Sequence, residues 1–191
     1  MYALDQIKDL RVYKTKSALV NAMHELITKK KFEDITVQNL CDIAMVRRAT
    51  FYLNFTDKLD LFSFYTKIQF TNFPTYLKLK ETNCTDNFLQ DLISDAIHYL
   101  NAHSDMVNML IRSDSMPLMI SIITDVIAKD VVEIFHHISN DNRNPIQNEI
   151  RARFYINGFF STYIWYTKET PSISEEDFIH SIINIVYHSP W

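Results

Sequence analysis

The sequence contains a single glycine, Gly158, in 191 residues. Tight β-hairpin turns and phosphate-binding loops need residues at positive φ, a conformation that glycine adopts most readily. A hairpin-rich fold and a nucleotide-binding loop are therefore disfavoured, and we expect helices joined by short polar loops. Hydrophobic residues make up 47% and charged residues 22% of the chain, which is typical of a globular protein and argues against a disordered one.

Cysteine is also scarce, and the two present, Cys41 and Cys84, do not have the spacing of metal ligands. No apolar run approaches the roughly 18 residues of a membrane span, the longest being residues 116–124. The N-terminus carries acidic residues where a signal peptide needs an apolar core. We therefore expect a reduced, cytoplasmic protein without a membrane segment.

Catalytic and metal-binding constellations are missing from the sequence as well. His136 and His137 are neighbours, which point about 100° apart on a helix, and the five-residue step from His98 to His103 also misses a common face. No nucleophile-histidine-acid set and no phosphate loop can be assigned. We expect neither enzymatic activity nor a metal or other cofactor.

The net charge of −4 is unevenly distributed along the chain. Residues 1–58 hold ten Lys or Arg against seven Asp or Glu, a net charge of +3, whereas residues 59–191 hold nine against sixteen, a net charge of −7. This asymmetry indicates a basic module, suited to phosphates, attached to an acidic body.

Apolar residues recur at three- and four-residue steps over residues 10–27, which is typical of one face of a helix. Thr36 is a suitable N-cap for a second helix of about eight residues, and a third short helix is predicted over residues 47–54. Two short helices joined by a tight turn form a helix-turn-helix unit. Further helices are predicted over residues 57–73, where Pro74 ends the helix, and over residues 86–101, 105–113, 117–138, 145–168 and 174–188.

The segment FEDITVQNLCDIAMVRRATFYLNFTDKLDL, residues 32–61, resembles the helix-turn-helix signature of the TetR family of bacterial regulators. The residues that match are Ile35-Thr36-Val37, Ala44 and Val46 in the turn, Thr50-Phe51-Tyr52, Phe55, Asp57-Lys58 and Leu61. Within the family, the RRATFY hexapeptide and the Thr-Lys before the first apolar face resemble most closely a branch related to dihydroxyacetone-kinase regulators. The resemblance implies a homodimeric, DNA-binding transcriptional repressor that is released by a ligand or a partner.

Three positions depart from the pattern of the family. Met45 stands in place of the usual turn glycine, Arg47 in place of a small hydroxyl residue that caps the recognition helix, and Ala49 in place of a second frequent glycine. The turn must therefore be made by a residue with a Cβ atom, and the capping hydroxyl is lost. The two arginines strengthen base and phosphate binding, so we interpret these changes as variation within a DNA-binding branch.

A recognition helix places its N-terminal residues in the major groove, where arginine can donate two hydrogen bonds to O6 and N7 of guanine. Arg47 and Arg48 occupy that place, although either could instead be a solvated surface charge, and Tyr52 could be a core ring. Thr36 and Lys58 lie at the starts of helices, which favour phosphate. The predicted DNA-binding residues are Thr36, Arg47, Arg48, Ala49, Thr50, Tyr52, Asn54 and Lys58.

The last two predicted helices carry more apolar and aromatic residues than a terminal helix pair needs for its own packing. The family commonly dimerises by packing this pair against its copy, and Gly158 would let the two backbones approach closely. A purely intramolecular core is the alternative. The predicted dimerisation residues are Phe154, Phe159, Phe160, Tyr163, Ile164, Phe178, Ile182, Ile183 and Val186.

The aromatic and methionine residues of the middle region fit either a plain core or an effector pocket. The candidate pocket residues are Phe62, Tyr65, Phe88, Tyr99, Met106, Met109 and Phe135. We therefore predict an all-α protein of about nine helices, with a three-helix DNA-binding domain over residues 1–58 and a helical dimerisation and effector- or partner-binding domain over residues 59–191. The expected partners are a palindromic DNA operator, a second copy, and a small-molecule effector or a protein. The alternative is a co-regulator that keeps the fold but answers to a partner protein.

Overall fold

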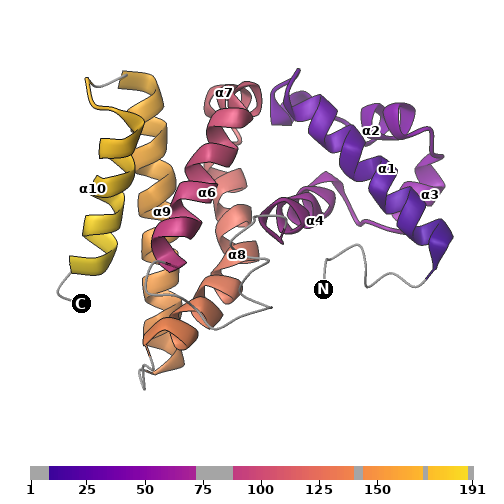
Figure 1. Ribbon diagram of the computed structural model, residues 1–191. Helices are drawn as coiled ribbons and strands as arrows, with labels where there is room; N and C mark the ends of the chain where they lie inside the picture. The colour runs from indigo at the N-terminus through magenta and orange to yellow at the C-terminus, as the bar shows by residue number, and fades with distance from the viewer. Residues whose placement is uncertain (1–8, 72–87, 140–143, 170–171, 189–191) are drawn as a thin grey trace. The chain divides into compact units, whose positions relative to one another are not determined.

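A computed structural model of the chain describes residues 9–71, 88–139, 144–169 and 172–188 (Figure 1). These residues form nine α-helices, one short 3-10 helix and connecting loops, with no strand among them. The predicted all-α class is therefore confirmed. No helix in the described ranges is long and apolar enough to cross a membrane.

The described residues divide into two compact units. The first unit comprises the described residues within 1–72 and 103–126, and the second comprises those within 73–102 and 127–191. The helix that begins at Lys58 packs against the N-terminal helix within the first unit, so the packing continues past residue 58. The predicted domain boundary after residue 58 separates the residues expected to contact DNA from the rest of the chain, and it stays a prediction.

The first unit begins with α1 (Leu10–Ile27), whose bounds agree with the prediction from apolar spacing. Asp9 caps this helix, since its carboxylate accepts a hydrogen bond from the Arg11 backbone N–H at 2.8 Å. The helix packs against α2 (Val37–Ala44) and α4 (Lys58–Thr71), with α3 (Arg48–Tyr52) following α2 (Figure 1). Its buried residues are Leu19, Val20, Ala22, Met23, Leu26 and Ile27.

The connection between α1 and α2 contains η1 (Phe32–Asp34), a single 3-10 turn. Phe32 and Ile35 are both buried and anchor this short connection in the core. The ring of Phe32 lies against that of Phe62, with the two centroids 5.2 Å apart. These contacts fix the turn that leads directly into the helix-turn-helix unit.

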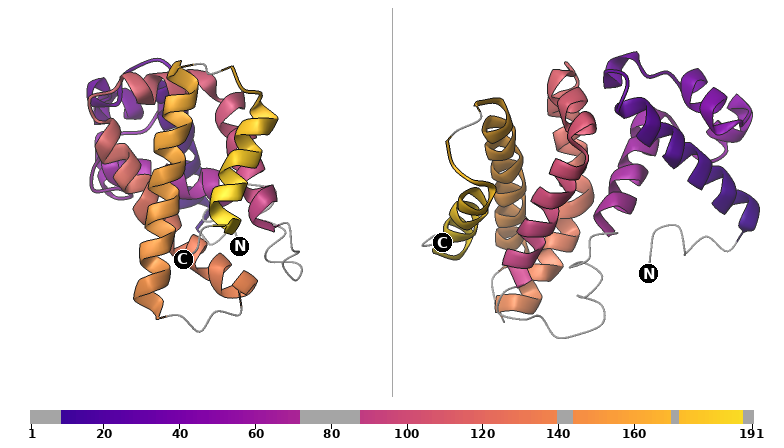
Figure 2. Two further views of the ribbon diagram at one scale, coloured as in Figure 1. Left: turned by 90° about the vertical axis from the view of Figure 1, so that its left-hand side faces the viewer. Right: turned by 45° about the horizontal axis from the view of Figure 1, so that its top comes forward.

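The remaining helices begin and end close to the predicted residues. They are α6 (Phe88–Ala102), α7 (Ser104–Arg112), α8 (Met116–Ser139), α9 (Pro145–Glu169) and α10 (Glu175–His188). The hydroxyl of Ser174 accepts a hydrogen bond from the Asp177 backbone N–H at 3.0 Å and thereby caps the start of α10. In the second unit α9 and α10 run side by side (Figure 2), and α10 also packs against α6. Pro74 lies outside the described residues.

Met45 makes the turn between α2 and α3, where the family usually has glycine. It adopts a left-handed conformation with a φ of 55°, the only positive φ of a non-glycine residue in the described part of the chain. This conformation lets the Val46 N–H reach back to the carbonyl oxygen of Cys41 at 3.0 Å. The Met45 side chain contributes little packing that would offset the cost of this conformation, because Met45 is 93% exposed.

Met45→Gly is therefore expected to stabilise the protein. The left-handed conformation costs an L-residue about 1–2 kcal/mol, and glycine avoids this cost. Glycine also has more freedom to lose on folding, which costs about 0.5–1 kcal/mol. We therefore expect the free energy of unfolding to rise by a net amount of about 0.5–1 kcal/mol. Urea unfolding of the wild type and the variant measures the gain. Met45→Ala keeps the Cβ atom and should show no gain, so equal stabilities of the glycine and alanine variants would contradict the explanation.

Candidate nucleic-acid interface

Thr36 and Asn39 fix the start of α2. The Thr36 hydroxyl accepts a hydrogen bond from the Asn39 backbone N–H at 3.1 Å, and the Asn39 side chain accepts one from the Thr36 backbone N–H at 3.3 Å. This reciprocal pair is a capping box and confirms Thr36 as the N-cap. Because the hydroxyl acts here as an acceptor, its own hydrogen can still be donated to a phosphate oxygen.

The recognition helix α3 is shorter than the predicted residues 47–54. Its N-cap is Arg47, whose side chain makes no capping hydrogen bond. Phe51 anchors the helix in the core with no exposed surface, and its ring lies 5.9 Å from that of Phe55. The helix ends at Tyr52, and beyond it the side-chain amide of Asn54 donates to the Thr50 carbonyl oxygen at 2.8 Å.

Arg48 and Tyr52 lie one helical turn apart on the exposed face of α3. Nη2 of Arg48 donates to Oη of Tyr52 at 3.4 Å, and the guanidinium carbon lies 6.0 Å from the centre of the tyrosine ring. This hydrogen bond raises the pKa of Arg48, so the guanidinium is cationic. Tyr52 is 51% exposed, which rules out the alternative of a core ring. The exposed face of α3 therefore presents the Arg48 guanidinium, which is oriented by the hydroxyl of Tyr52.

The other predicted residues of this surface differ in accessibility. Arg47 and Ala49 are exposed, whereas Thr50 and Asn54 are half-buried. The prediction did not include two exposed apolar residues that flank α3, Met45 and Leu53, of which Leu53 is 85% exposed. Their positions beside a turn and a helix end gave no pattern from which exposure could be predicted.

Lys58 does not belong to the exposed surface, which corrects the prediction of a phosphate contact. Its Nζ donates to the backbone carbonyl oxygens of Phe32 at 2.8 Å, Glu33 at 3.2 Å and Ile35 at 2.8 Å. An ammonium has three N–H donors, and all three are used by η1 and the residue after it. Burial lowers the pKa of Lys58, while Glu33 and Asp34 oppose that shift. Lys58 holds the turn in place and has no N–H left for DNA.

Lys58→Met should reveal this structural role. Removing the ammonium leaves part-buried carbonyl groups without their donor, which costs about 1–3 kcal/mol of the free energy of unfolding. Chemical denaturation measures the loss, and Lys30→Met, at an exposed lysine, should leave the stability within about 0.5 kcal/mol of the wild type. If Lys58 instead contacted phosphate, the variant would keep its stability and lower the salt dependence of DNA binding.

Three of the predicted dimerisation residues, Tyr163, Phe178 and Ile182, are buried within the protomer, which corrects that part of the prediction. Phe178 stacks on Tyr166 with a centroid distance of 4.2 Å and lies 6.5 Å from the ring of Tyr163. The hydroxyl of Tyr163 donates to the Asn101 side-chain oxygen at 2.6 Å, and burial raises the pKa of Tyr163 to about 12. These residues join α9 to α6 and α10 and cannot face a second copy.

The other predicted dimerisation residues remain accessible. Phe154 is 67% exposed, and the half-buried ones are Phe159, Phe160, Ile164, Ile183 and Val186. Four large apolar residues of α9 are exposed at steps that place them on one face, and we call them the α9 stripe: Ile146, Ile150, Phe154 and Trp165. Gly158 lies on the same face, where an added Cβ atom would meet nothing within 4 Å. The protomer itself therefore does not require glycine at this position.

The candidate pocket residues are distributed over both units. Phe62, Tyr65 and Met106 are buried in the first unit, where Oη of Tyr65 lies 2.9 Å from Nδ1 of His24 and 3.4 Å from Sδ of Met106. Met109, half-buried, belongs to the first unit and Tyr99 to the second. The side chains of Phe88 and Phe135 lie outside the described residues. An effector pocket stays a prediction.

Comparison with known proteins supports the fold. No protein-family model and no curated protein sequence matches the chain. Among solved structures, the dihydroxyacetone kinase operon activator DhaS matches 91% of this chain and 94% of its own, with 16% identity and a TM-score of 0.50. Two crystal structures of NalD, the secondary repressor of the MexAB-OprM multidrug efflux pump in Pseudomonas aeruginosa, match with a TM-score of 0.55.

The two NalD structures cover 94% and 93% of this chain and 100% and 98% of their own, at 15% and 16% identity. Both DhaS and NalD are TetR-family regulators, so the predicted resemblance is confirmed at the level of the fold. The chain has the TetR-type fold. Its placement in the branch of dihydroxyacetone-kinase regulators stays a prediction.

Proposed function

We propose that this chain is a sequence-specific, DNA-binding transcriptional regulator of the TetR type that acts in the cytoplasm. The observation that carries the proposal is the exposed start of α3, where Arg47 and the Arg48–Tyr52 pair lie next to each other. Base reading requires cationic donors at the N-terminal end of a helix held by a helix-turn-helix unit. The fold provides the unit, and these residues provide the donors.

Arg48 is the best placed residue for reading a guanine. Only one of its hydrogen bonds goes to Tyr52, so other N–H groups of the guanidinium are available for O6 and N7. Arg47 lies one residue earlier and, with no capping bond of its own, is free to reach a base or a phosphate. The Thr36 hydroxyl at the start of α2 adds a phosphate contact that fixes the register of the helix on the duplex.

The proposed regulator binds its operator as a homodimer. The α9 stripe places four exposed apolar side chains on one face of α9, and Gly158 on that face lets another backbone approach closely. Two copies of one reading helix recognise two half-sites about 34–36 Å apart, so the operator is palindromic. Such a dimer is released when a ligand or a partner favours a form with the wrong half-site spacing.

The sign of regulation follows from the promoter and is not fixed by the fold, because DhaS is an operon activator whereas NalD is a repressor. We propose repression for this chain, because a protein bound to a promoter most simply blocks it. The chain contributes binding and release of DNA in this scheme and no chemical step, so no enzymatic activity is proposed.

Selection from random duplex DNA tests the proposal directly. The full chain should enrich a palindrome with two half-sites, and its affinity should fall steeply with salt concentration because phosphate contacts release counterions. Failure to enrich any sequence, with only weak and sequence-independent binding, would contradict the proposal. In that case the co-regulator that answers to a protein partner becomes the better account.

A further inference from the structure

Glu33, on the 3-10 turn before the helix-turn-helix unit, is bound by a turn about 80 residues further along the chain. Its Oε2 accepts a hydrogen bond from the hydroxyl of Ser113, and its Oε1 accepts one from the Asp114 backbone N–H at 3.0 Å. Ser113 is buried, and its hydroxyl also accepts from the Ser115 backbone N–H at 3.1 Å. Both carboxylate oxygens are therefore used by the turn between α7 and α8.

The same 3-10 turn is held on its carbonyl side by the ammonium of Lys58. Three backbone carbonyl oxygens of residues 32–35 accept hydrogen bonds from Lys58. The Glu33 carboxylate accepts hydrogen bonds from residues 113 and 114. The hydrogen bond from Ser113, first among several, lowers the pKa of Glu33 to about 2, so the carboxylate is charged at neutral pH. Charge-assisted hydrogen bonds of this kind are stronger than those between neutral groups.

We propose that Glu33 is a positioning residue for DNA recognition, which links the α7–α8 turn to the placement of α2 and α3. The proposal rests on the proposed function. Ile35 follows the 3-10 turn and directly precedes Thr36, the N-cap of α2, so a shift of the turn displaces the start of the helix-turn-helix unit. Coupling between the two segments requires that the contact at Glu33 be made in one state of the protein and broken in another.

The other end of this contact lies directly before α8. Residues 113–115 directly precede α8, which is one continuous helix from Met116 to Ser139, and the boundary between the two compact units falls within it, after Val126. The residues that bind Glu33 therefore lie directly before the first turn of α8, and a shift of that turn acts on Glu33.

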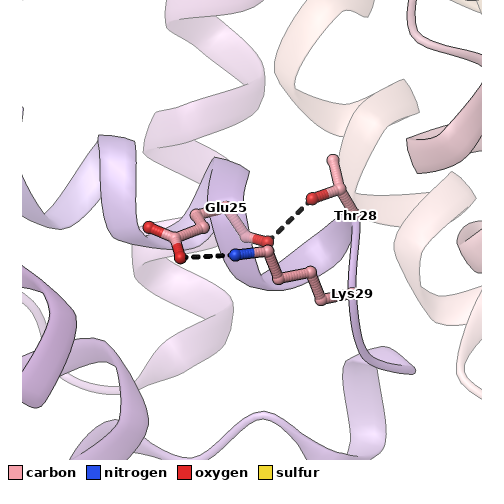
Figure 3. A network of polar contacts seen from close by, with 3 residues as sticks. All are labelled: Glu25, Thr28 and Lys29. Carbon is pink, nitrogen blue, oxygen red and sulfur yellow. Dashed lines mark hydrogen bonds and ion pairs between the residues drawn. The ribbon is translucent and has the colours of Figure 1, made fainter.

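Hydrogen exchange of the full chain, read by mass spectrometry, tests the link without any DNA. Glu33→Ala should speed exchange about 5-fold or more both in residues 113–116 and in residues 36–52, because the two segments lose a shared contact. The control is Glu25→Ala. The Glu25 carboxylate binds Nζ of Lys29 at 2.7 Å, and its carbonyl oxygen accepts from the Thr28 hydroxyl, so both contacts stay at one end of α1 (Figure 3).

The control should leave exchange in both segments unchanged. Faster exchange in residues 113–116 alone would overturn the proposal, because the contact would then exist without positioning α2 and α3. Faster exchange in every helix, including α6 and α10, would also overturn it, since Glu33 would then support overall stability only. Glu33→Gln keeps one acceptor oxygen and should give an intermediate effect in both segments.

A double-mutant cycle with DNA completes the test. The probe is the duplex that the wild-type chain selects, and affinity is measured for Glu33→Ala, Ser113→Ala and the double variant. If both residues act through one contact, each single variant should weaken binding about 5-fold or more and the double variant no further. Additive losses would overturn the proposal. If no duplex is selected at all, the proposed function fails, while the exchange experiment still decides whether Glu33 couples the two segments.

Discussion

Arg48→Ala is expected to weaken binding to the selected operator about 5- to 150-fold, which corresponds to the loss of about 1–3 kcal/mol for one bidentate contact to guanine. Affinity for unrelated duplex DNA should fall much less, because a base contact contributes to specificity and a phosphate contact to all sequences alike. Fluorescence anisotropy with the operator and with a scrambled duplex, at one salt concentration, measures both affinities. The ratio of the two is the decisive quantity.

Arg47→Ala should follow the same pattern if Arg47 reads a base, and should weaken both duplexes alike if it contacts phosphate. Tyr52→Phe removes the hydroxyl that accepts from Arg48 and keeps the ring, so a smaller loss of specificity is expected. Arg112→Ala is the matched control, because it removes an exposed arginine from the end of α7. Unchanged operator affinity for both Arg47→Ala and Arg48→Ala would contradict the assignment of α3 as the reading helix.

The helices could be predicted from the sequence because their signals are local. Apolar spacing over residues 10–27 and the cap at Thr36 involve residues within a few positions of each other. A turn made by a residue with a Cβ atom was expected at Met45 from the match to the helix-turn-helix signature, and the structure shows that Met45 makes it in a left-handed conformation. The exposure of Tyr52 was left open by the sequence, which allowed a core ring, and only the structure shows the side chain on the surface.

Contacts between distant residues could not be predicted. Lys58 was expected on DNA because it begins a helix, but its ammonium is bound by carbonyl groups 23 to 26 residues away. Glu33 had no signal at all, since its partners lie about 80 residues away. In both cases the tertiary fold decides which polar group a charged side chain meets, and no spacing along the chain reports it.

The spacing of apolar residues likewise does not predict which of them are buried within the protomer and which remain exposed. Tyr163, Phe178 and Phe154 belong to the same aromatic-rich pair of helices, yet the first two are only 2% exposed and Phe154 is 67% exposed. The difference arises because α10 packs on one side of α9 and leaves the other side open. This division reduces the candidate dimer surface to the α9 stripe and the half-buried residues beside it.

Phe154→Glu is expected to convert the proposed dimer into monomers and to weaken operator binding by about 100- to 10,000-fold, the largest effect that we predict. A phenylalanine buried in an interface contributes about 1.5–3 kcal/mol, and in a two-fold symmetric dimer the substitution removes it twice. The variant also places two like charges in an apolar interface, which costs further free energy because neither carboxylate has a partner there. Loss of the dimer then removes the gain from binding two linked half-sites.

Analytical ultracentrifugation at micromolar concentration separates the two states, and anisotropy with the full operator and with a single half-site measures the lost avidity. Phe154→Glu should bind the half-site as tightly as the wild type does, because α3 is unchanged, and should lose its preference for the full operator. Phe154→Leu keeps an apolar side chain at the same position and should remain dimeric, whereas Ile150→Glu, one turn away on the same stripe, should dissociate as Phe154→Glu does. A wild-type monomer at this concentration, or a Phe154→Glu dimer with undiminished operator affinity, would show that the α9 stripe is not the surface on which two copies meet.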